Sequence, residues 1–155
     1  MNIEELENRL LEEGCKWFVI PPFQHDGVNV ALATGVDVLE NENGIWKIYF
    51  AERGTKKTPI FESSSEKEAC DHYYKIITSE EHWHIVGVYE NEINAFKLQE
   101  KLENIEVNFR KNSRLPSKDG DPGLIFISVL GKAIFKVREL YSDLPLKDYP
   151  ANNLK

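Results

Sequence analysis

Residues 41–52 constrain the fold more than any other stretch, because a tight turn leads directly into the most strand-like segment of the chain. Asn41-Glu42-Asn43-Gly44 is a turn sequence, and Ile45 to Glu52 is rich in aromatic and β-branched side chains. A second turn at Arg53 to Lys57 leads back into Thr58 to Glu62. These residues predict an antiparallel hairpin at the centre of a sheet.

Helical patterns flank this hairpin. An apolar stripe that ends at Gly14 predicts a helix over residues 3–13. Ser65 and Glu68 form a capping box, which predicts a helix from there to Ile77. Less regular strand signals occur at Lys16–Phe23, at residues 28–32 and at residues 36–38. The first segment, residues 1–80, is therefore predicted to contain a helix, four or five antiparallel strands and a second helix.

The second segment, residues 81–155, starts an independent pattern and ends in a proline-containing tail. We expect a strand at 83–89, a helix at 90–103, a strand at 105–109, a long loop at 110–123, a strand at 124–129 and a helix at about 130–142. This order suggests a small ferredoxin-like sheet with both helices on one face. The predicted fold class is α+β, an antiparallel sheet with flanking helices; whether the two segments are separate domains stays open.

The negative charge is concentrated in the first segment. The chain has a net charge of −7; residues 1–80 hold 15 acidic and 8 basic side chains, whereas residues 81–155 hold 11 of each. An acidic surface repels nucleic acids and anionic lipids and attracts cationic partners. We therefore expect neither a nucleic acid nor a membrane as partner. The acidic start of the chain does not resemble a signal peptide, so the expected compartment is the cytoplasm.

Motifs of known chemistry are missing from the sequence. No nucleophile elbow, metalloprotease motif or phosphate-binding glycine loop is present. His82 and His84 flank Trp83 and could bind a metal only with further ligands at a suitable spacing. The basic residues between Arg110 and Lys118 have no aromatic residue among them for stacking on bases. We expect a protein that is not an enzyme and that uses no cofactor and no metal.

One segment carries a resemblance. The run from Ile45 to Gly54 (IWKIYFAERG), then Phe61-Glu62-Ser63 and Ser65 to Tyr74 (SEKEACDHYY), resembles bacterial immunity proteins of polymorphic toxin and contact-dependent growth inhibition systems. The resemblance covers residues 40–78. It implies a protein that binds a cognate toxin C-terminal domain, expected to be a nuclease, and occludes its active site. No catalytic residue is implied.

The alternative comes from the second segment. Residues 83–141 are similar in element order to the SPOR-type fold, with Asn94-Ala95 in the helix. That similarity implies an intracellular binding or adaptor domain that recognises a glycan or a peptide. The sequence leaves the oligomeric state open.

The candidate partner-binding residues are acidic side chains before and within the turn that precedes the central hairpin. They are Asp26, Asp37, Glu40 and Glu42. Taken singly, each of these residues is more often a solvated loop carboxylate. The three tryptophans, Trp17, Trp46 and Trp83, are candidate interface anchors, although tryptophan within a strand is more often a core residue.

Overall fold

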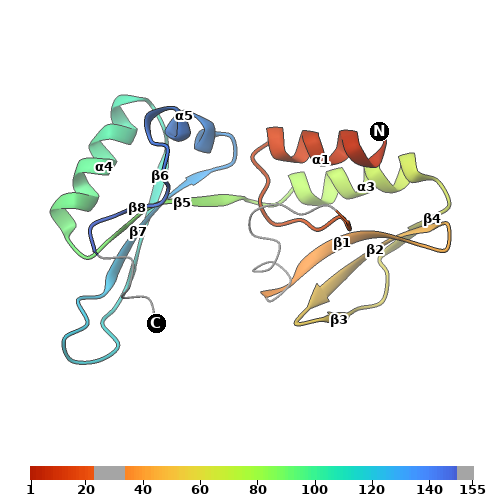
Figure 1. Cartoon of the computed structure of the whole chain (residues 1–155), viewed down its shortest axis with the longest axis horizontal. Coiled ribbons are helices and arrows are strands. Elements are labelled where there is room, and N and C mark those ends of the chain that lie inside the picture. The colour runs from red at the N-terminus through yellow and green to blue at the C-terminus, as the bar shows by residue number, and fades with distance from the viewer. Residues whose placement is uncertain (23–33, 150–155) are drawn as a thin grey trace. The chain divides into compact units, whose positions relative to one another are not determined.

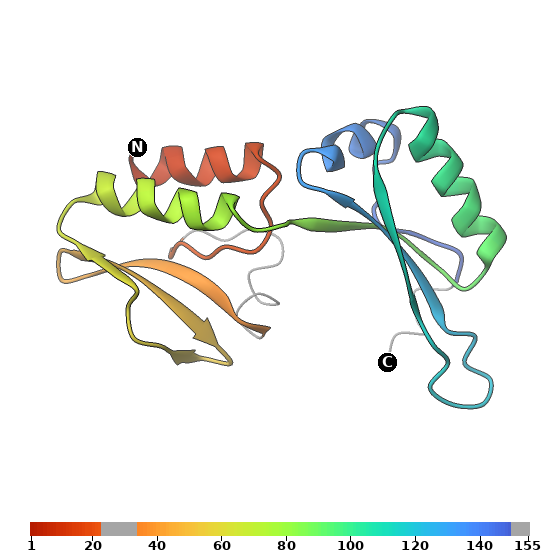
Figure 2. The same ribbon diagram turned by 180° about the vertical axis from the view of Figure 1, so that it is seen from behind.

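The computed structural model describes residues 1–22 and 34–149, and it divides the chain into two compact units. The N-terminal unit is Met1–His82 and the C-terminal unit is Trp83–Lys155. Each unit has its own sheet with helices packed on one face (Figures 1 and 2). The predicted α+β class is confirmed. The strand signal at residues 28–32 lies outside the described residues.

The sheet of the N-terminal unit is built around strand β2 (Ile45–Glu52). β1 (Val36–Glu42) pairs antiparallel along one side of β2, and β3 (Thr55–Lys56) and β4 (Phe61–Ser63) pair along the other. Asn43 and Gly44 have φ angles of 55° and 85°, the combination of a two-residue hairpin turn of type I′. This turn fixes the β1–β2 register, in which Glu42 pairs with Ile45.

The return of the predicted hairpin is interrupted. Instead of one strand through Thr58 to Glu62, the structure has the short strands β3 and β4 with a gap between them. Pro59 lies in this gap, and proline has no N–H to donate to a sheet ladder. The turn and the strand Ile45–Glu52 are confirmed, whereas its partner is divided in two.

Helices α1 (Ile3–Glu12) and α3 (Glu66–Thr78) lie side by side on one face of this sheet (Figure 1). Leu39 and Ile48 form a cross-strand pair that is completely buried with the helices. Their strand neighbours Val38 and Tyr49 are buried in a separate cluster on the opposite face, as the two-residue alternation of a strand requires. The core shared with the helices contains Leu6, Leu10, Phe18, Ile20, Ala69, Tyr73 and Ile77.

Both helices begin with a side-chain cap, but the complete capping box belongs to α1. Asn2 and Glu5 form it: each side chain accepts a hydrogen bond from the backbone N–H of the other. At α3, Ser65 accepts from the N–H of Glu68 as predicted. The carboxylate of Glu68, however, accepts from the hydroxyl of Ser63 at 2.8 Å, so the reciprocal half of the predicted box has been replaced.

Residues 16–22 do not form the strand predicted for Lys16–Phe23. They contribute one isolated parallel bridge between Val19 and Val38, and Phe23 lies outside the described residues. The hydroxyl of Tyr73 accepts a hydrogen bond from the N–H of Val19 at 3.0 Å. A side chain thus satisfies a backbone group that a sheet ladder would otherwise pair.

The C-terminal unit has the element order β-α-β-β-α-β. Its elements are β5 (Trp83–Tyr89), α4 (Glu92–Asn104), β6 (Phe109–Arg114), β7 (Leu124–Leu130), α5 (Ala133–Leu140) and β8 (Leu146–Lys147). The strand order is β6-β7-β5-β8, and α4 and α5 cover one face of the sheet (Figure 2). The predicted strand-helix-strand-strand-helix order is confirmed, and its βαββ portion has the ferredoxin-like arrangement with β7 between β5 and β6. The core below the helices includes Val86, Leu98, Leu102, Ile127, Val129, Ile134 and Val137.

Two parts of this unit differ from the prediction. β6 runs from Phe109 to Arg114, so the strand predicted at residues 105–109 is shifted into the stretch predicted to be a loop, and the loop is confined to residues 115–123. Two residues of the predicted tail form β8, which pairs with β5 in the parallel direction. Among the described residues, no helix combines the length and the apolar character needed to cross a bilayer.

Candidate functional site

Charge separates the two units more sharply than it separates the two halves of the sequence. Met1–His82 contains sixteen Asp and Glu against eight Lys and Arg, a net charge of −8 with histidine neutral. Trp83–Lys155 contains ten Asp and Glu against eleven Lys and Arg, a net charge of +1. The whole acidic surplus therefore belongs to one folded unit, which attracts cationic partners over about a Debye length, ~8 Å at physiological salt.

The described acidic candidates lie on strand β1 and not on the turn after it. Asp37, Glu40 and Glu42 are all within Val36–Glu42, while Asp26 lies outside the described residues. Side chains alternate along a strand, so Glu40 and Glu42 share one face of the sheet and Asp37 points to the other. The structure brings two of the candidates together and separates them from the third.

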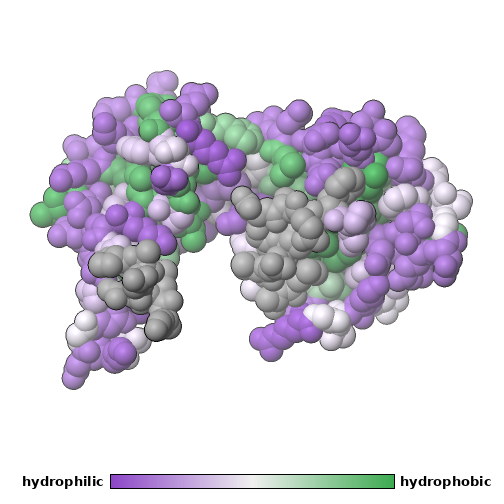
Figure 3. Space-filling model, in the orientation of Figure 1, coloured by the Kyte–Doolittle hydropathy of each residue, from purple (hydrophilic) through white to green (hydrophobic). Residues whose placement is uncertain are grey.

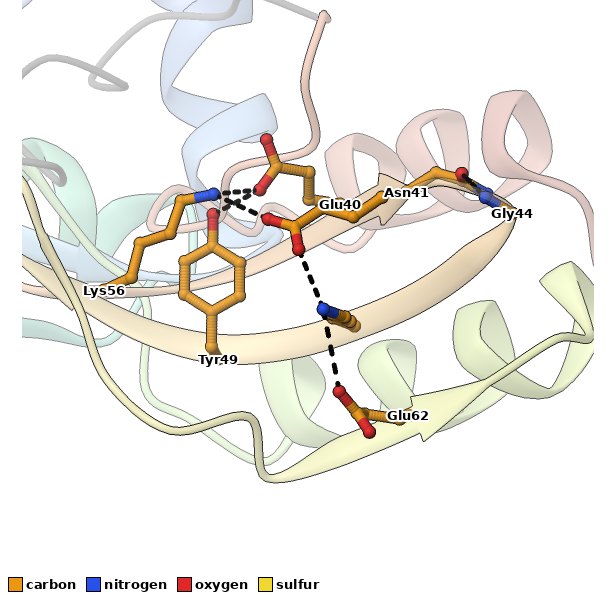
Figure 4. Close-up of polar contacts among 8 residues, drawn as sticks. Glu40, Asn41, Gly44, Tyr49, Lys56 and Glu62 are labelled. Atoms are coloured by element: carbon orange, nitrogen blue, oxygen red, sulfur yellow. Dashed lines mark hydrogen bonds and ion pairs between the residues drawn. The ribbon is translucent and has the colours of Figure 1, made fainter.

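Glu40 and Glu42 belong to a network of ionised side chains on the sheet face opposite the helices (Figure 4). Lys56 Nζ donates to Glu40 at 2.6 Å and to Glu42 at 3.0 Å. Lys47 Nζ donates to Glu42 at 2.8 Å and lies 3.9 Å from Glu62. The Tyr49 hydroxyl donates to Glu40 at 2.7 Å. We call these six residues the charge cluster: Glu40, Glu42, Lys47, Tyr49, Lys56 and Glu62.

The contacts of the charge cluster keep its paired members ionised. The hydrogen bond from Lys56 lowers the pKa of Glu40, with partial desolvation opposing it and the Tyr49 hydroxyl adding to it. Hydrogen bonds from Lys47 and Lys56 lower the pKa of Glu42. The pKa of Lys56 is raised in turn, first by its hydrogen bond to Glu40. Three carboxylates and two ammonium groups leave the cluster with a net charge of −1, much weaker than an unpaired acidic surface.

Asp37 lies in different surroundings. Its side chain is half-buried, and burial raises the pKa of its carboxyl group. Its backbone oxygen accepts a hydrogen bond from the Tyr73 hydroxyl at 2.5 Å. Partial desolvation, together with the charge of Asp37, also raises the pKa of Glu80, although His82 opposes the shift. Asp37 thus belongs to the region where α3 ends, away from the charge cluster.

The two histidines considered as metal ligands are held in different ways. His82 precedes β5 and is buried in the N-terminal unit, whereas His84 lies within β5. The N–H of Lys16 donates to His82 Nδ1 at 3.1 Å, so Nε2 carries the proton and donates to the Ile77 carbonyl at 2.8 Å. Both ring nitrogens of His82 are therefore engaged with the backbone. Within residues 1–22 and 34–149, no group of three or more His, Cys, Asp or Glu side chains is arranged to hold a metal ion.

Sequence reasoning missed four members of the charge cluster: Lys47, Tyr49, Lys56 and Glu62. Lys47 and Tyr49 follow from the turn, because a two-residue hairpin at Asn43-Gly44 places them opposite Glu40 and Val38. Applying the register to both strands would therefore have exposed the ion pairing. Lys56 requires the position of β3, which the sequence pattern did not give.

Apolar anchors beside the charge cluster are few. Ile45 pairs with Glu42 on the same face and is 39% exposed. All three tryptophans are half-buried: Trp46 packs against the core shared with the helices, and Trp17 packs against the Val38–Tyr49 cluster. Trp83 belongs to the C-terminal unit, where the Arg110 guanidinium lies 4.2 Å from its ring centre.

A comparison of the chain with protein-family models, with curated proteins and with solved structures finds no match.

Proposed function

We propose that this protein is an immunity protein, which binds a cationic toxin domain and neutralises it by covering its active site. The observation that carries the proposal is the confinement of the acidic surplus to the N-terminal unit, with −8 on Met1–His82 against +1 on the remainder. Opposite potentials accelerate association and disfavour wrong partners. The resemblance of residues 40–78 to immunity proteins supports the same class. A nuclease binds the phosphates of its substrate in a cationic cleft, which an acidic protein is suited to cover. The toxin would therefore be a nuclease.

The charge cluster is the proposed contact surface. An ionised carboxylate has about four acceptor positions, and Glu42 uses two of them for Lys47 and Lys56. Glu62 is half exposed, and among the described residues its one ion pair is a long contact to Lys47. Arginine or lysine side chains of a partner can therefore join the network without displacing its lysines. Because these carboxylates are already ordered, less conformational entropy is lost on binding.

The test uses the C-terminal domain encoded by the gene adjacent to this one. That domain and the full chain are expressed together and separately, and cell growth, co-purification and association rates are measured. We expect the domain to be toxic alone, harmless with this protein, and bound to it in a stable complex. A domain that is not bound, or one whose toxicity is unchanged, rules out the proposal for that gene pair.

A matched pair of variants tests the contact surface. E40Q/E42Q removes two negative charges from the charge cluster, and E100Q/E103Q removes two from exposed positions of α4. We expect the first pair to slow association about tenfold at low salt and to reduce its salt dependence, and the second to have little effect. Equal rates for the two pairs would exclude the cluster as the contact surface. Thermal unfolding of both variants shows whether each remains folded.

A second candidate function is glycan or peptide binding by the C-terminal unit, and a surface on its sheet favours it. On the face away from α4 and α5, Ile85 and Leu130 are 42% and 41% exposed beside the stacked pair of Trp83 and Arg110. Apolar groups next to a stacked aromatic ring suit a sugar ring or a peptide side chain. Co-sedimentation of the full chain with purified cell-wall sacculi tests the glycan form, and a W83A variant should sediment less. Protein that stays in the supernatant at low salt excludes glycan binding.

A further inference from the structure

The N-terminal unit ends in a buried histidine that the proposed toxin contact does not use. The side chain of His82 is 4% exposed, and β5 begins at the next residue. Histidine is the side chain whose charge ordinarily changes between about pH 5 and about pH 8. The contacts of this ring therefore decide whether the end of the unit responds to pH.

The His82 ring joins two backbone segments that are far apart in sequence. Its Nδ1 accepts from the N–H of Lys16, which follows α1, at 3.1 Å. Its Nε2–H donates to the carbonyl of Ile77, in the last turn of α3, at 2.8 Å. The neutral ring with its proton on Nε2 satisfies both backbone groups at once. It thereby fixes residue 16 against the end of α3.

A protonated ring cannot keep both contacts. The imidazolium has an N–H on each nitrogen and no acceptor. Its Nε2–H can still donate to Ile77, but its Nδ1–H would point at the N–H of Lys16. Two donors cannot share one hydrogen bond, so the ring has to move and the Lys16 N–H loses its acceptor. Protonation and the contact to Lys16 therefore exclude each other.

The ionisable groups around this joint come from β1, from α3 and from the residues that precede and follow these elements. They are Cys15, Lys16, Asp37, Tyr73 and Glu80.

Glu80 is exposed and interacts electrostatically with His82. Its negative charge favours the ring cation and offers it a new partner. Burial raises the pKa of Cys15 to about 11 and the pKa of Tyr73 well above its ordinary value, so both stay neutral when histidine changes charge. The Lys16 ammonium lies over the Trp17 ring, 4.7 Å from its centre.

We propose that His82 is a pH-dependent conformational switch at the point where the chain leaves the N-terminal unit (Figure 1). The neutral ring holds the N–H of Lys16. The protonated ring releases it and turns toward Glu80. The effect stays local, because Val19 is held separately: its N–H donates to the Tyr73 hydroxyl and its carbonyl accepts from the N–H of Leu39.

The experiment follows the full-length ¹⁵N-labelled chain by NMR from about pH 7.5 to about pH 5. Long-range ¹H–¹⁵N spectra report the state of the His82 ring, and backbone amides report the two anchored positions. We expect the neutral ring to have its proton on Nε2 at the upper pH. The ring and the Lys16 amide should then shift with the same midpoint. The exchange protection of the Lys16 amide should fall about tenfold, as for the loss of one buried hydrogen bond, whereas that of Val19 should change little.

Three variants assign the switch. H82N offers a side-chain oxygen near the position of Nδ1 but does not titrate, so its Lys16 amide should show no transition. E80Q removes the partner of the ring cation and should move the transition to lower pH by about half a unit. H72Q is the matched control, because His72 lies on α3, is exposed and stacks on the Phe61 ring. It should leave the transition unchanged.

Three results would overturn the switch. The first is a His82 ring that takes up a proton while the protection of the Lys16 amide stays the same. The second is a ring that stays neutral until the unit unfolds. The third is a Lys16 transition that persists in H82N or disappears in H72Q. The first two are measured on the unmodified chain, so they decide the matter even where H82N does not fold.

Discussion

Among single residues, Tyr73 joins two backbone segments that are far apart in sequence. Its hydroxyl accepts from the N–H of Val19 at 3.0 Å and donates its one hydrogen to the carbonyl of Asp37 at 2.5 Å, and the carbonyl of Val19 lies 3.2 Å away. The side chain is fully buried. Removing the hydroxyl takes this partner away from the N–H of Val19 and the carbonyl of Asp37, whereas the carbonyl of Val19 still accepts from the N–H of Leu39 at 3.0 Å.

We therefore expect Y73F to lower the free energy of unfolding of the N-terminal unit by about 2 kcal/mol. Urea unfolding followed by circular dichroism measures the change. Tyr74 is the matched control. It follows Tyr73 in the sequence, is half-buried, and has its ring against the Arg9 guanidinium. Y74F should change stability by less than about 0.5 kcal/mol. Equal losses in the two variants would show that the Tyr73 hydrogen bonds contribute little.

The two cysteines give a second prediction for single residues. Cys15 and Cys70 are free and buried, and burial, followed by nearby acidic groups, raises the pKa of each thiol to about 11. The thiolate is the reactive form, so both should react slowly with a thiol reagent at pH 7.5 or so and rapidly in urea. Mass spectrometry of alkylated protein, with free glutathione as the reference thiol, follows the reaction. Rapid labelling of the native chain would contradict the packing of this core.

For secondary-structure elements, the approach of β5 to α4 depends on Gly87. Its φ angle is not in the left-handed region, so the requirement for glycine is steric: a Cβ atom would meet Leu98 and Tyr89. We expect G87A to destabilise the C-terminal unit by about 1–3 kcal/mol, as overpacking does. Amide hydrogen exchange in β7 measures it.

A double-mutant cycle makes this prediction specific. L98A leaves a cavity and destabilises the unit by itself, but it also makes room for a methyl group at residue 87. The double variant G87A/L98A should therefore lose less stability than the two single losses added together. Simple additivity would place the clash somewhere other than Leu98.

Elements with regular periodicity were predictable, and elements on the sheet edges were not. β2 and the turn before it follow from the amphipathic pattern and from Asn43-Gly44. β6 is an edge strand in which every residue after Phe109 is exposed, so no buried face leaves an apolar alternation in its sequence. β8 is two residues long and is held by hydrogen bonds from Glu90, Asn91 and Asn94 to Asp148, contacts that depend on the tertiary fold.

The candidate site, like the fold, was predictable from the sequence only in part. Strand alternation and hairpin register place Glu40 and Glu42 on one face with Lys47, so part of the charge cluster was within reach of the sequence. The burial of Asp37 and the pairing of Lys56 depend on the positions of α3 and β3.

At the scale of the whole molecule, Asp121 and Asp37 contribute to folding stability with opposite pH dependence. Asp121 in the C-terminal unit accepts hydrogen bonds from Arg114, Ser117 and Gly123, which hold its pKa well below the ordinary range. Its stabilising contribution is present above the unfolded pKa, about 3.9, and is lost as the pH drops through the folded value. Asp37 has a raised pKa, so its contribution is present below about 3.9 and is lost as the pH rises.

Two asparagine variants should therefore show opposite signs. At pH 7, D121N should be less stable than the unmodified chain and D37N more stable. The D121N difference should shrink only as the pH falls below about 3.9, whereas the D37N difference should already have disappeared when the pH has fallen to about 3.9. Each unit has its own core, so hydrogen exchange is measured separately in β7 for D121N and in β1 for D37N. A stability difference that does not change with pH would show that the effect of the substitution is not electrostatic.

The exposed strand β6 has a consequence for behaviour at high concentration. It ends the sheet of the C-terminal unit, and the loop beyond it is mostly hydrophilic (Figure 3). An uncovered edge offers its free backbone groups to any other extended chain, which is how fibrils begin. Arg110, Lys111 and Arg114 place three long basic side chains along this edge; Lys111 pairs with Glu92, Arg114 pairs with Asp121, and Arg110 lies over the ring of Trp83. Charged side chains on an edge strand disfavour pairing with another strand. Threonine has a high β-propensity and no charge. Replacing these three side chains by threonine should therefore make β6 an edge strand that pairs with other copies and supports amyloid growth.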